Sequence, residues 1–294
     1  MEFTYSIVIP HYKIPDLLVK CLMSIPKRND IQIIVVDDHS PDGDLYLDRY
    51  PELRREGLVY IHAPRNGGIG YARNIGIKYA EGKWLLFCDA DDTFSPEAFS
   101  IMDSFVGTDA KIVFFRPRIE YYGNSGRVSP YSWLTRMYDK FKLNGDERYI
   151  RSYHVVAWSK MFNREWLDET GLSFEESRYS EDVIFSIKTG IKADRVIVSD
   201  DVIYNYIVRE GSHSDFSKKD TLRLVERAKV GMRANRILRD EYSLGYSDGF
   251  VAMSALLKFD KKSFFKLFIN SSQYGASRMM IIKQLLNRFI SKWK

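Results

Sequence analysis

Three carboxylates crowd the end of one short apolar segment. The segment 84–88 (WLLFC) is followed at once by Asp89, Asp91 and Asp92. On an extended chain alternate side chains point the same way, so we expect Asp89 and Asp91 to converge while Asp92 points elsewhere. Two such oxygen ligands suit Mg²⁺ or Mn²⁺, which share a substrate's phosphates. The alternative is structural: Asp91 or Asp92 caps a helix that begins near Pro96, or closes a turn.

A second strand-like segment also ends in acids. The stretch VVDDHSPDG (35–43) places Asp37 and Asp38 directly after a β-branched run. A carboxylate accepts hydrogen bonds, so Asp38 is a candidate to bind the imide N–H of a uracil-like base. The alternative is that its side chain closes an Asx turn.

A glycine-rich stretch lies between these two acidic segments. RNGGIGYARNIG (65–76) fits neither a Walker P-loop nor a GxGxxG that leads out of a strand, but it places Arg73 on a helix that precedes the acidic segment. A guanidinium neutralises diphosphate charge well, which makes Arg73 a candidate diphosphate ligand. The alternative is a surface ion pair.

A further acidic pair stands much later in the chain. In YSEDVIF (179–185), Glu181 and Asp182 come just before an apolar run. A carboxylate at this place can act as a general base. Alternatively, the two acids stand in the first turn of a helix and complement its dipole.

The elements that position these residues alternate over the first hundred positions. Strands are predicted at 5–10, 31–36, 58–62 and 84–88, and helices at 16–25 and 70–80. Near-continuous apolar strands separated by helices predict an α/β fold with a parallel sheet covered on both faces. Ligands bind such sheets outside the carboxyl ends of the strands, where this chain carries Pro10-His11-Tyr12, Asp38 and Asp89-Ala90-Asp91.

Composition is that of an ordinary globular enzyme. The 294 residues are 45% hydrophobic and 28% charged, enough for one large domain or two small ones. Cys21 and Cys88 form no CxxC or Cys/His pattern, which argues against a disulfide framework or a zinc site and favours a reducing compartment. No signal peptide is predicted at the N-terminus, and no apolar run approaches the roughly 18 residues of a membrane span.

The net charge of +5 is concentrated at the C-terminal end. Residues 258–294 contain nine Lys or Arg and one acid, so that this stretch carries +8 and the remainder about −3. Its last part is predicted to form a basic amphipathic helix, which suits an anionic membrane surface, with FFKLF (264–268) as a possible addition. The alternative is packing of the apolar stripe on the body or on a second subunit. Nucleic acid is a poorer fit, because no reader motif accompanies the charge. The stripe comprises Met279, Ile282, Leu286, Phe289 and Trp293.

Taken in order, these motifs resemble the family 2 inverting glycosyltransferases with a GT-A fold. The resemblance covers roughly residues 5–215 and rests on IPHY, VVDDHSPDG, RNGGIGYARNIG, FCDADD, WSKMF, SEDVIF and YNYIVREGSHS. It implies a Rossmann-like, mixed but mainly parallel sheet flanked by helices. The implied division is a nucleotide-sugar-binding half (1–100), an acceptor-binding half (101–215) and a C-terminal helical basic extension (216–294).

The resemblance also implies roles on the donor side. The donor is a nucleotide-diphosphate sugar, with a UDP-sugar favoured. Pro10 and Tyr12 would line the base pocket, and Asp38 would read the base. Asp89 and Asp91 are the DxD pair: Asp91 would bind the Mn²⁺ or Mg²⁺ that bridges the diphosphate, and Asp89 would lie nearer the ribose or the sugar.

The remaining roles concern the acceptor and a closing loop. Asp182 matches the catalytic base, with Glu181 beside it, and Trp158 and Lys160 match a W-x-K segment on the acceptor side. Arg209 and His213 match a loop that closes over the diphosphate. His213 is equally well interpreted as a plain loop histidine, because many relatives have an apolar residue there.

The expected function is sugar transfer to a saccharide or lipid-linked acceptor in cell-surface polysaccharide synthesis. The expected location is cytoplasmic, or peripheral on the inner face of the plasma membrane. A catalytically silent sugar-nucleotide-binding scaffold is a second hypothesis, against which intact Asp91 and Asp182 argue. A nucleotidyltransferase is a third hypothesis. This chain argues against it, because no Gly-rich, Lys- or Arg-bearing loop follows the first strand, where IPHYKIPD stands.

Overall fold

The computed structural model describes residues 2–121, 132–208, 220–246 and 248–291. Within these ranges the strands form one sheet in the order β3-β2-β1-β4-β7-β6-β8-β5. Neighbours β3, β2, β1 and β4 run parallel, as do β6 and β8, whereas β7 is antiparallel to both of its neighbours. The strands are β1 (Tyr5–His11), β2 (Ile31–Asp37), β3 (Leu58–His62), β4 (Trp84–Phe87), β5 (Thr93–Phe94), β6 (Ile112–Tyr121), β7 (Lys160–Asn163) and β8 (Val196–Val208).

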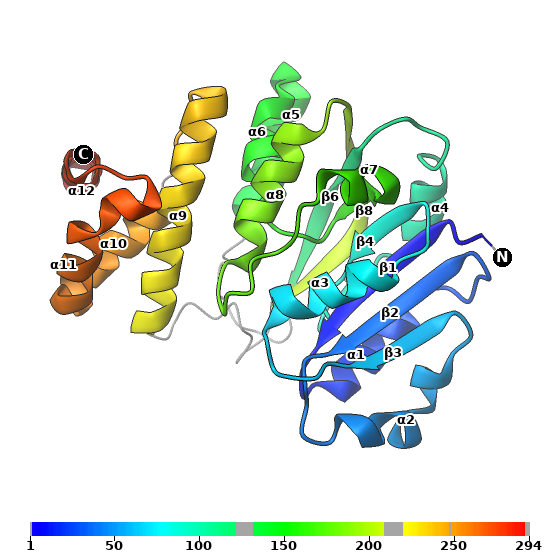
Figure 1. Cartoon of the computed structure of the whole chain (residues 1–294). Helices are drawn as coiled ribbons and strands as arrows, with labels where there is room; N and C mark the ends of the chain where they lie inside the picture. Colours follow the sequence, from blue (N-terminus) through cyan, green and yellow to red (C-terminus); the bar gives the residue numbers. More distant parts are fainter. Residues whose placement is uncertain (1, 122–131, 209–219, 247, 292–294) are drawn as a thin grey trace.

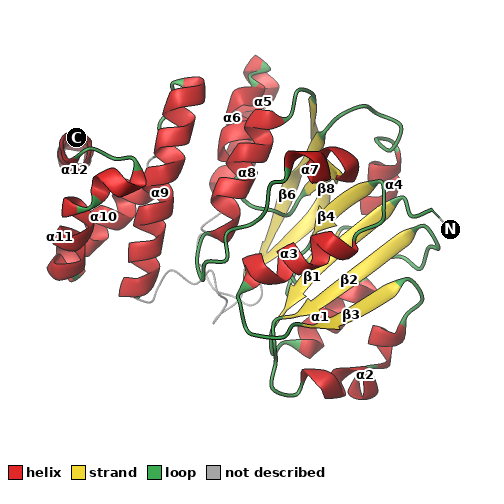
Figure 2. Cartoon of the chain, in the orientation of Figure 1, coloured by secondary structure: helices red, strands yellow, loops and turns green. Residues whose placement is uncertain are grey.

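Helices cover both faces of the sheet (Figures 1 and 2). They are α1 (Pro15–Met23), α2 (Tyr46–Arg49), α3 (Ile69–Tyr79), α4 (Ala98–Asp103), α5 (Ser132–Asn144), α6 (Glu147–Tyr153), α7 (Arg164–Thr170), α8 (Glu181–Lys192), α9 (Thr221–Tyr242), α10 (Asp248–Phe259), α11 (Lys261–Ile269) and α12 (Arg278–Ser291).

The two faces of the sheet have separate apolar cores because side chains alternate along each strand. On β1, Ile7 and Ile9 pack with residues of α1, α2 and α4, whereas Val8 packs with residues of α3, α5, α6, α7 and α8. Burial on both sides explains why these strands read as continuous apolar runs. The predicted α/β class with its covered sheet is confirmed.

The C-terminal helices add a layer beyond α8. Helix α9 packs on α8 through Val230, Ala234 and Leu238, which share a core with Val183 and Ile187. Figure 1 shows α5, α6 and α8 between this layer and the sheet. A second core holds α9, α10, α11 and α12 together, and α9 crosses α10 at a pair of facing glycines, Gly231 and Gly249. The prediction that the chain is mainly helical after residue 216 is confirmed for the described residues.

Each strand and helix predicted in the first hundred residues is present, with ends shifted by at most two residues. Two local expectations are wrong. The acidic segment is not extended: the Asp92 N–H donates to the Asp89 carbonyl at 3.0 Å, which closes a turn. Helix α4 has no side-chain cap and is preceded by Glu97, so neither Asp91 nor Asp92 caps it.

Asp38 fixes the start of α3. Its carboxylate accepts the backbone N–H groups of Gly67 at 2.7 Å and Gly68 at 2.8 Å. Gly68 precedes the helix at a φ of 86°, a conformation that favours glycine. The negative charge lies at the positive end of the helix dipole and satisfies two donors that the helix itself leaves unpaired. The local turn expected of Asp38 is made by Asp37, whose carboxylate accepts from the Ser40 N–H at 3.2 Å.

We predict that Asp38→Ala lowers the free energy of unfolding by about 1–3 kcal/mol without any nucleotide, because two partly buried N–H groups lose their acceptor. Urea denaturation measures the loss. Asp42→Ala is the matched control: its carboxylate lies in the same loop and is 65% exposed. Equal stability of the two variants would show that Asp38 is no cap.

Candidate functional site

The predicted site residues gather where β1, β2 and β4 end and α8 begins. Arg73 of α3 connects two of these places. Its Nη2 donates to Asp89 Oδ1 at 2.7 Å and its Nη1 donates to Glu181 Oε1 at 2.9 Å. The Arg73 side chain is only 2% exposed. The ion pair foreseen as the alternative for Arg73 therefore exists, but it is buried and not at the surface.

The turn after β4 gives its carboxylates different environments. Asp89 and Asp91 are half-buried, whereas Asp92 is buried. Asp92 accepts the Tyr204 hydroxyl at 2.7 Å and the Ile207 N–H at 2.7 Å, both on β8. Burial, and then the charges of Asp91 and Asp89, raise the pKa of Asp92 well above its usual range. Asp92 thus ties the turn to β8.

Trp158, in the loop before β7, supports the same connection. Its ring stacks on Tyr204 at 5.0 Å and on Tyr206 at 5.3 Å, with interplanar angles of 5° and 13°. Trp158 is buried, so it shapes the site from beneath. Its contact with an acceptor stays a prediction.

Asp182 has the properties of a proton acceptor. It stands in the first turn of α8 and is half-buried. Burial, followed by the neighbouring charge of Glu181, raises its pKa to about 8, while Arg73 acts in the opposite direction. A carboxylate with a raised pKa is a stronger base. The first-turn position also complements the helix dipole, as the structural alternative for this acidic pair expects, and the role of base stays a prediction.

Lys160 lies buried close to this base. It begins β7, and its Nζ donates to the His154 carbonyl at 2.7 Å. Burial lowers its pKa to about 7, against the opposing charge of Asp182. Its role toward an acceptor stays a prediction.

Beside the expected base pocket, the strand-end residues His11 and Asp37 form a row with His62, a contact that the sequence analysis did not predict. His11, Asp37 and His62 are in register at the ends of β1, β2 and β3. His62 Nδ1 lies 2.8 Å from Asp37 Oδ2, and burial lowers the pKa of His11 to about 4, which keeps it neutral. Gly43 packs directly on this row, since a Cβ there would lie 2.0 Å from Asp37 Oδ2. The sequence signal for this row is that each of the three strands ends in a polar residue.

Of the other residues predicted around the base, Pro10 is buried in β1 and Tyr12 is 41% exposed just beyond it. The Lys13 ammonium lies 4.8 Å from the centre of the Tyr12 ring. Arg209 and His213 lie outside the described residues.

A divalent cation fits the acidic turn only with help from a substrate. No group of three or more His, Cys, Asp or Glu side chains in the described ranges is arranged to hold a metal ion. Asp89 and Asp91 supply hard oxygens at the protein surface, and Mg²⁺ or Mn²⁺ commonly completes its shell with phosphates and water. Since Arg73 engages one oxygen of Asp89, Asp91 is the principal candidate ligand.

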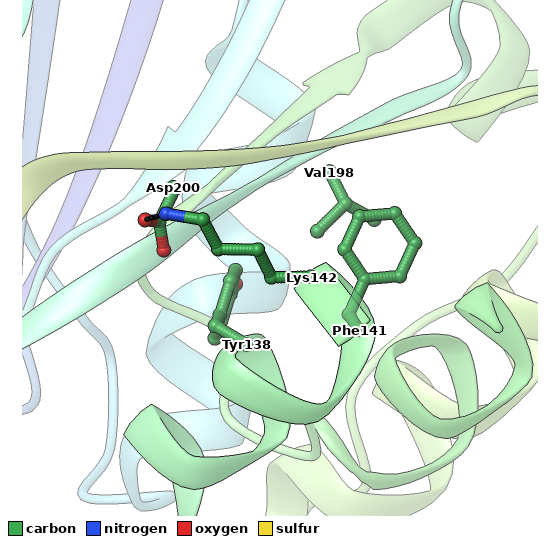
Figure 3. A pocket seen from close by; sticks show the side chains of 5 residues that line it. All are labelled: Tyr138, Phe141, Lys142, Val198 and Asp200. Atoms are coloured by element: carbon green, nitrogen blue, oxygen red, sulfur yellow. Dashed lines mark hydrogen bonds and ion pairs between the residues drawn. The ribbon is translucent and has the colours of Figure 1, made fainter. Parts of the chain in front are cut away.

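A separate small pocket lies between α5 and β8 (Figure 3). It is lined by Tyr138, Phe141, Lys142, Val198 and Asp200, and the Lys142 Nζ lies 3.3 Å from Asp200 Oδ2. None of the predicted site residues lines it, and we assign it no role in the site.

Relatives of known sequence match most of the chain. A poly(ribitol-phosphate) β-glucosyltransferase of Bacillus spizizenii is 31% identical over 71% of this chain. A poly(ribitol-phosphate) β-N-acetylglucosaminyltransferase, TarS of Staphylococcus aureus, is 27% identical over 71%. The matched parts are 33% and 36% of those proteins, so the chain spans about a third of the length of these curated relatives.

Solved structures agree in fold. Residues 1–349 of S. aureus TarS, in complex with UDP-GlcNAc, match 90% of this chain and 73% of that one, with 25% identity and a TM-score of 0.61. A mannosyltransferase of Pyrobaculum calidifontis, in complex with GDP-Man and Mn²⁺, matches all of this chain and 88% of that one at 15% identity and a TM-score of 0.55, a likeness of fold. The model of glycosyl transferase family 2 matches residues 6–171, more than half of the chain. The chain therefore belongs to glycosyl transferase family 2.

Proposed function

We propose that this protein is a metal-dependent inverting glycosyltransferase that moves a sugar from a nucleotide-diphosphate donor to a hydroxyl group. The observation that carries the proposal is the meeting of two motifs: the Asp89–Asp91 turn and the start of α8, which bears Asp182, are bound to one arginine. A donor site and a base thereby come together in one place.

The chemistry follows from the separate properties of the carboxylates. Asp182 would accept the proton of the acceptor hydroxyl as that oxygen attacks the anomeric carbon. The bond from that carbon to the diphosphate oxygen breaks as the new glycosidic bond forms, on the opposite face, so the configuration inverts. When bound, the divalent ion held by Asp91 and Asp89 would neutralise the charge of the departing diphosphate.

A UDP-sugar is the first donor to test, because the S. aureus relative was solved with UDP-GlcNAc. Two relatives whose names contain poly(ribitol-phosphate) suggest an acceptor in cell-surface polymer synthesis. A saccharide or a lipid-linked oligosaccharide is the acceptor class that we propose. Asp38, Pro10 and Tyr12 are proposed to bind the base, and Arg209 and His213 to approach the diphosphate.

A panel of UDP-, GDP- and dTDP-sugars with Mn²⁺ tests the proposal through release of nucleoside diphosphate. We predict release from one donor, and a loss of about 10²-fold or more in Asp91→Ala or with EDTA, because a cation offsets several kcal/mol of developing charge. Asp48→Ala, whose carboxylate is 73% exposed and distant in sequence, is the control. Pyrophosphate as the product would indicate a nucleotidyltransferase. Binding in calorimetry without turnover in any donor–acceptor pair would favour a silent scaffold.

The raised pKa of Asp182 predicts a pH dependence. Below its pKa of about 8 the carboxyl is protonated and cannot accept a proton, so kcat/KM is expected to rise with pH up to about 8 and then level off. Asp182→Asn is expected to lose about 10²–10⁴-fold and to lack this rise. Initial rates with Mg²⁺ across this range measure it. An unchanged profile in Asp182→Asn would remove Asp182 from the role of base.

We propose further that α12 contacts an anionic membrane surface. Met280, Ile281 and Leu285 pack against the other C-terminal helices. The other face of α12 exposes Met279, Ile282 and Leu286 by 73%, 41% and 56%, with exposed Arg278 and Lys283 along its edges. This arrangement of an apolar stripe between cations suits an interface of anionic lipid. The side chains of Phe289 and Trp293 lie outside the described residues.

The structure bears on the alternatives for this stripe. Met279, Ile282 and Leu286 are exposed in the single chain, so this described part of the stripe is not packed on the body. No helix in the described residues is both long enough and apolar enough to cross a membrane. We propose that the contact of α12 with the membrane is peripheral and lies on the inner face of the plasma membrane.

Sedimentation with vesicles tests this contact. We predict binding to phosphatidylcholine vesicles that contain phosphatidylglycerol, weak binding without it, and a loss of binding when Met279, Ile282 and Leu286 are changed together to Ser. Leu143→Ser, at an 87% exposed position on α5, is the control. Unchanged vesicle binding by the triple variant would show that this face of α12 is not the membrane contact. A concentration-dependent dimer abolished by the same substitutions would assign the stripe to a second subunit.

A further inference from the structure

Helix α3 touches the segment before Asp182 at several places. Asn74 forms two hydrogen bonds with the backbone of Phe174: its Nδ2 donates to the Phe174 carbonyl at 2.9 Å, and its Oδ1 accepts the Phe174 N–H at 2.8 Å. The Arg73 guanidinium lies 5.2 Å from the centre of the Phe174 ring. Gly70 allows close approach, since a Cβ there would lie 2.2 Å from the Glu175 carbonyl oxygen.

The same segment is linked onward into α8. The Phe174 ring stacks on Phe185 with centroids 3.9 Å apart, and both belong to the core on this face of the sheet. Arg73 reaches Glu181, which precedes Asp182 by one residue, and on its other side reaches Asp89. One turn of α3 therefore contacts the Asp89–Asp91 turn, the loop at Phe174 and the start of α8.

The contacts of Arg73 argue against direct binding of a diphosphate. Both of its Nη atoms are engaged by carboxylates, and its Nε is buried without a hydrogen-bond partner in the described residues. The side chain is only 2% exposed, so a phosphate oxygen would have to enter a buried position between these carboxylates to reach the guanidinium. A buried arginine paired on both sides fits a rigid connection better than a substrate contact.

We propose that Arg73 and Asn74 are positioning residues that hold the start of α8 at a fixed place relative to the Asp89–Asp91 turn. The proposal rests on the proposed function in so far as Asp182 is the base. It assigns to Arg73 a role through other residues, in place of direct contact with the donor.

The first test needs no substrate. Hydrogen–deuterium exchange is measured on wild type, Arg73→Met and Asn74→Ala. We expect faster amide exchange within 174–185 in both variants, while exchange in β1, β2 and β3 stays as in wild type. Arg65→Met is the matched control, because Arg65 pairs with Glu176 of the same segment at 2.6 Å but is 57% exposed. Unchanged exchange within 174–185 in both variants would overturn the proposal.

The second test separates positioning from donor binding. If Arg73 positions the base, Arg73→Met is expected to lower kcat by about 100-fold, the loss that a misplacement of roughly 1 Å can cause, while the donor dissociation constant from calorimetry stays nearly unchanged. Arg73→Lys keeps the charge but cannot bind both carboxylates with a planar guanidinium, so its kcat should lie between those of wild type and Arg73→Met. A dissociation constant that rises in proportion to the loss would show a diphosphate ligand and overturn the proposal.

A double-mutant cycle tests whether Arg73 acts through its contact with Glu181. Glu181→Gln should lower kcat in the same direction, and the Arg73→Met/Glu181→Gln double variant should lose less than the product of the two single losses, because both act through one contact. Independent, multiplicative losses would contradict the route through Glu181. Failure of the wild type with every donor would refute the proposed function, whereas the exchange experiment still decides the positioning role.

Discussion

A buried guanidinium with a carboxylate on each side links the two halves of the site. Removing an arginine from water is costly, and the cost is offset only when its charge is paired and its donors are used. Arg73 is paired with Asp89 on one side and Glu181 on the other through its two Nη atoms, while its Nε has no hydrogen-bond partner in the described residues. Loss of one partner of a buried pair typically costs about 3–5 kcal/mol, so the pairing resists separation of α3 from β4 and α8.

This constraint gives a physical reason for the crowding of acids after an apolar strand. The three aspartates of the turn have different partners. Asp92 is buried and binds Tyr204 and the backbone of β8, and Asp89 is bound to the arginine. Like charges at short range are tolerated because hydrogen bonds and one cation are built around them. The three aspartates therefore serve partly to hold the turn against β8 and α3, and partly as the proposed cation site.

The order of elements, and the edge of the sheet at which the candidate site residues gather, could be predicted from the sequence, because both follow from local patterns. Apolar runs gave the strands, and polar residues at the strand ends gave the location. The pairing of Arg73 with Glu181, 108 positions away, could not be predicted, because no local pattern records which distant residue fills a buried position. The same holds for Asp38, whose partners Gly67 and Gly68 belong to another loop. The turn at Asp89–Asp92 was foreseen only as an alternative, because the expected alternation of side chains assumes an extended chain.

The most direct test of the account is a crystal structure with Mn²⁺ and the donor that supports turnover, recorded at the manganese absorption edge. The account predicts an anomalous peak between the Asp91 carboxylate and the donor diphosphate, with the Arg73 guanidinium still bound to Asp89 and Glu181 and the Asp182 carboxylate facing the anomeric carbon. A metal away from the β4 turn, or an Arg73 that has left Glu181 to bind the diphosphate, would contradict it.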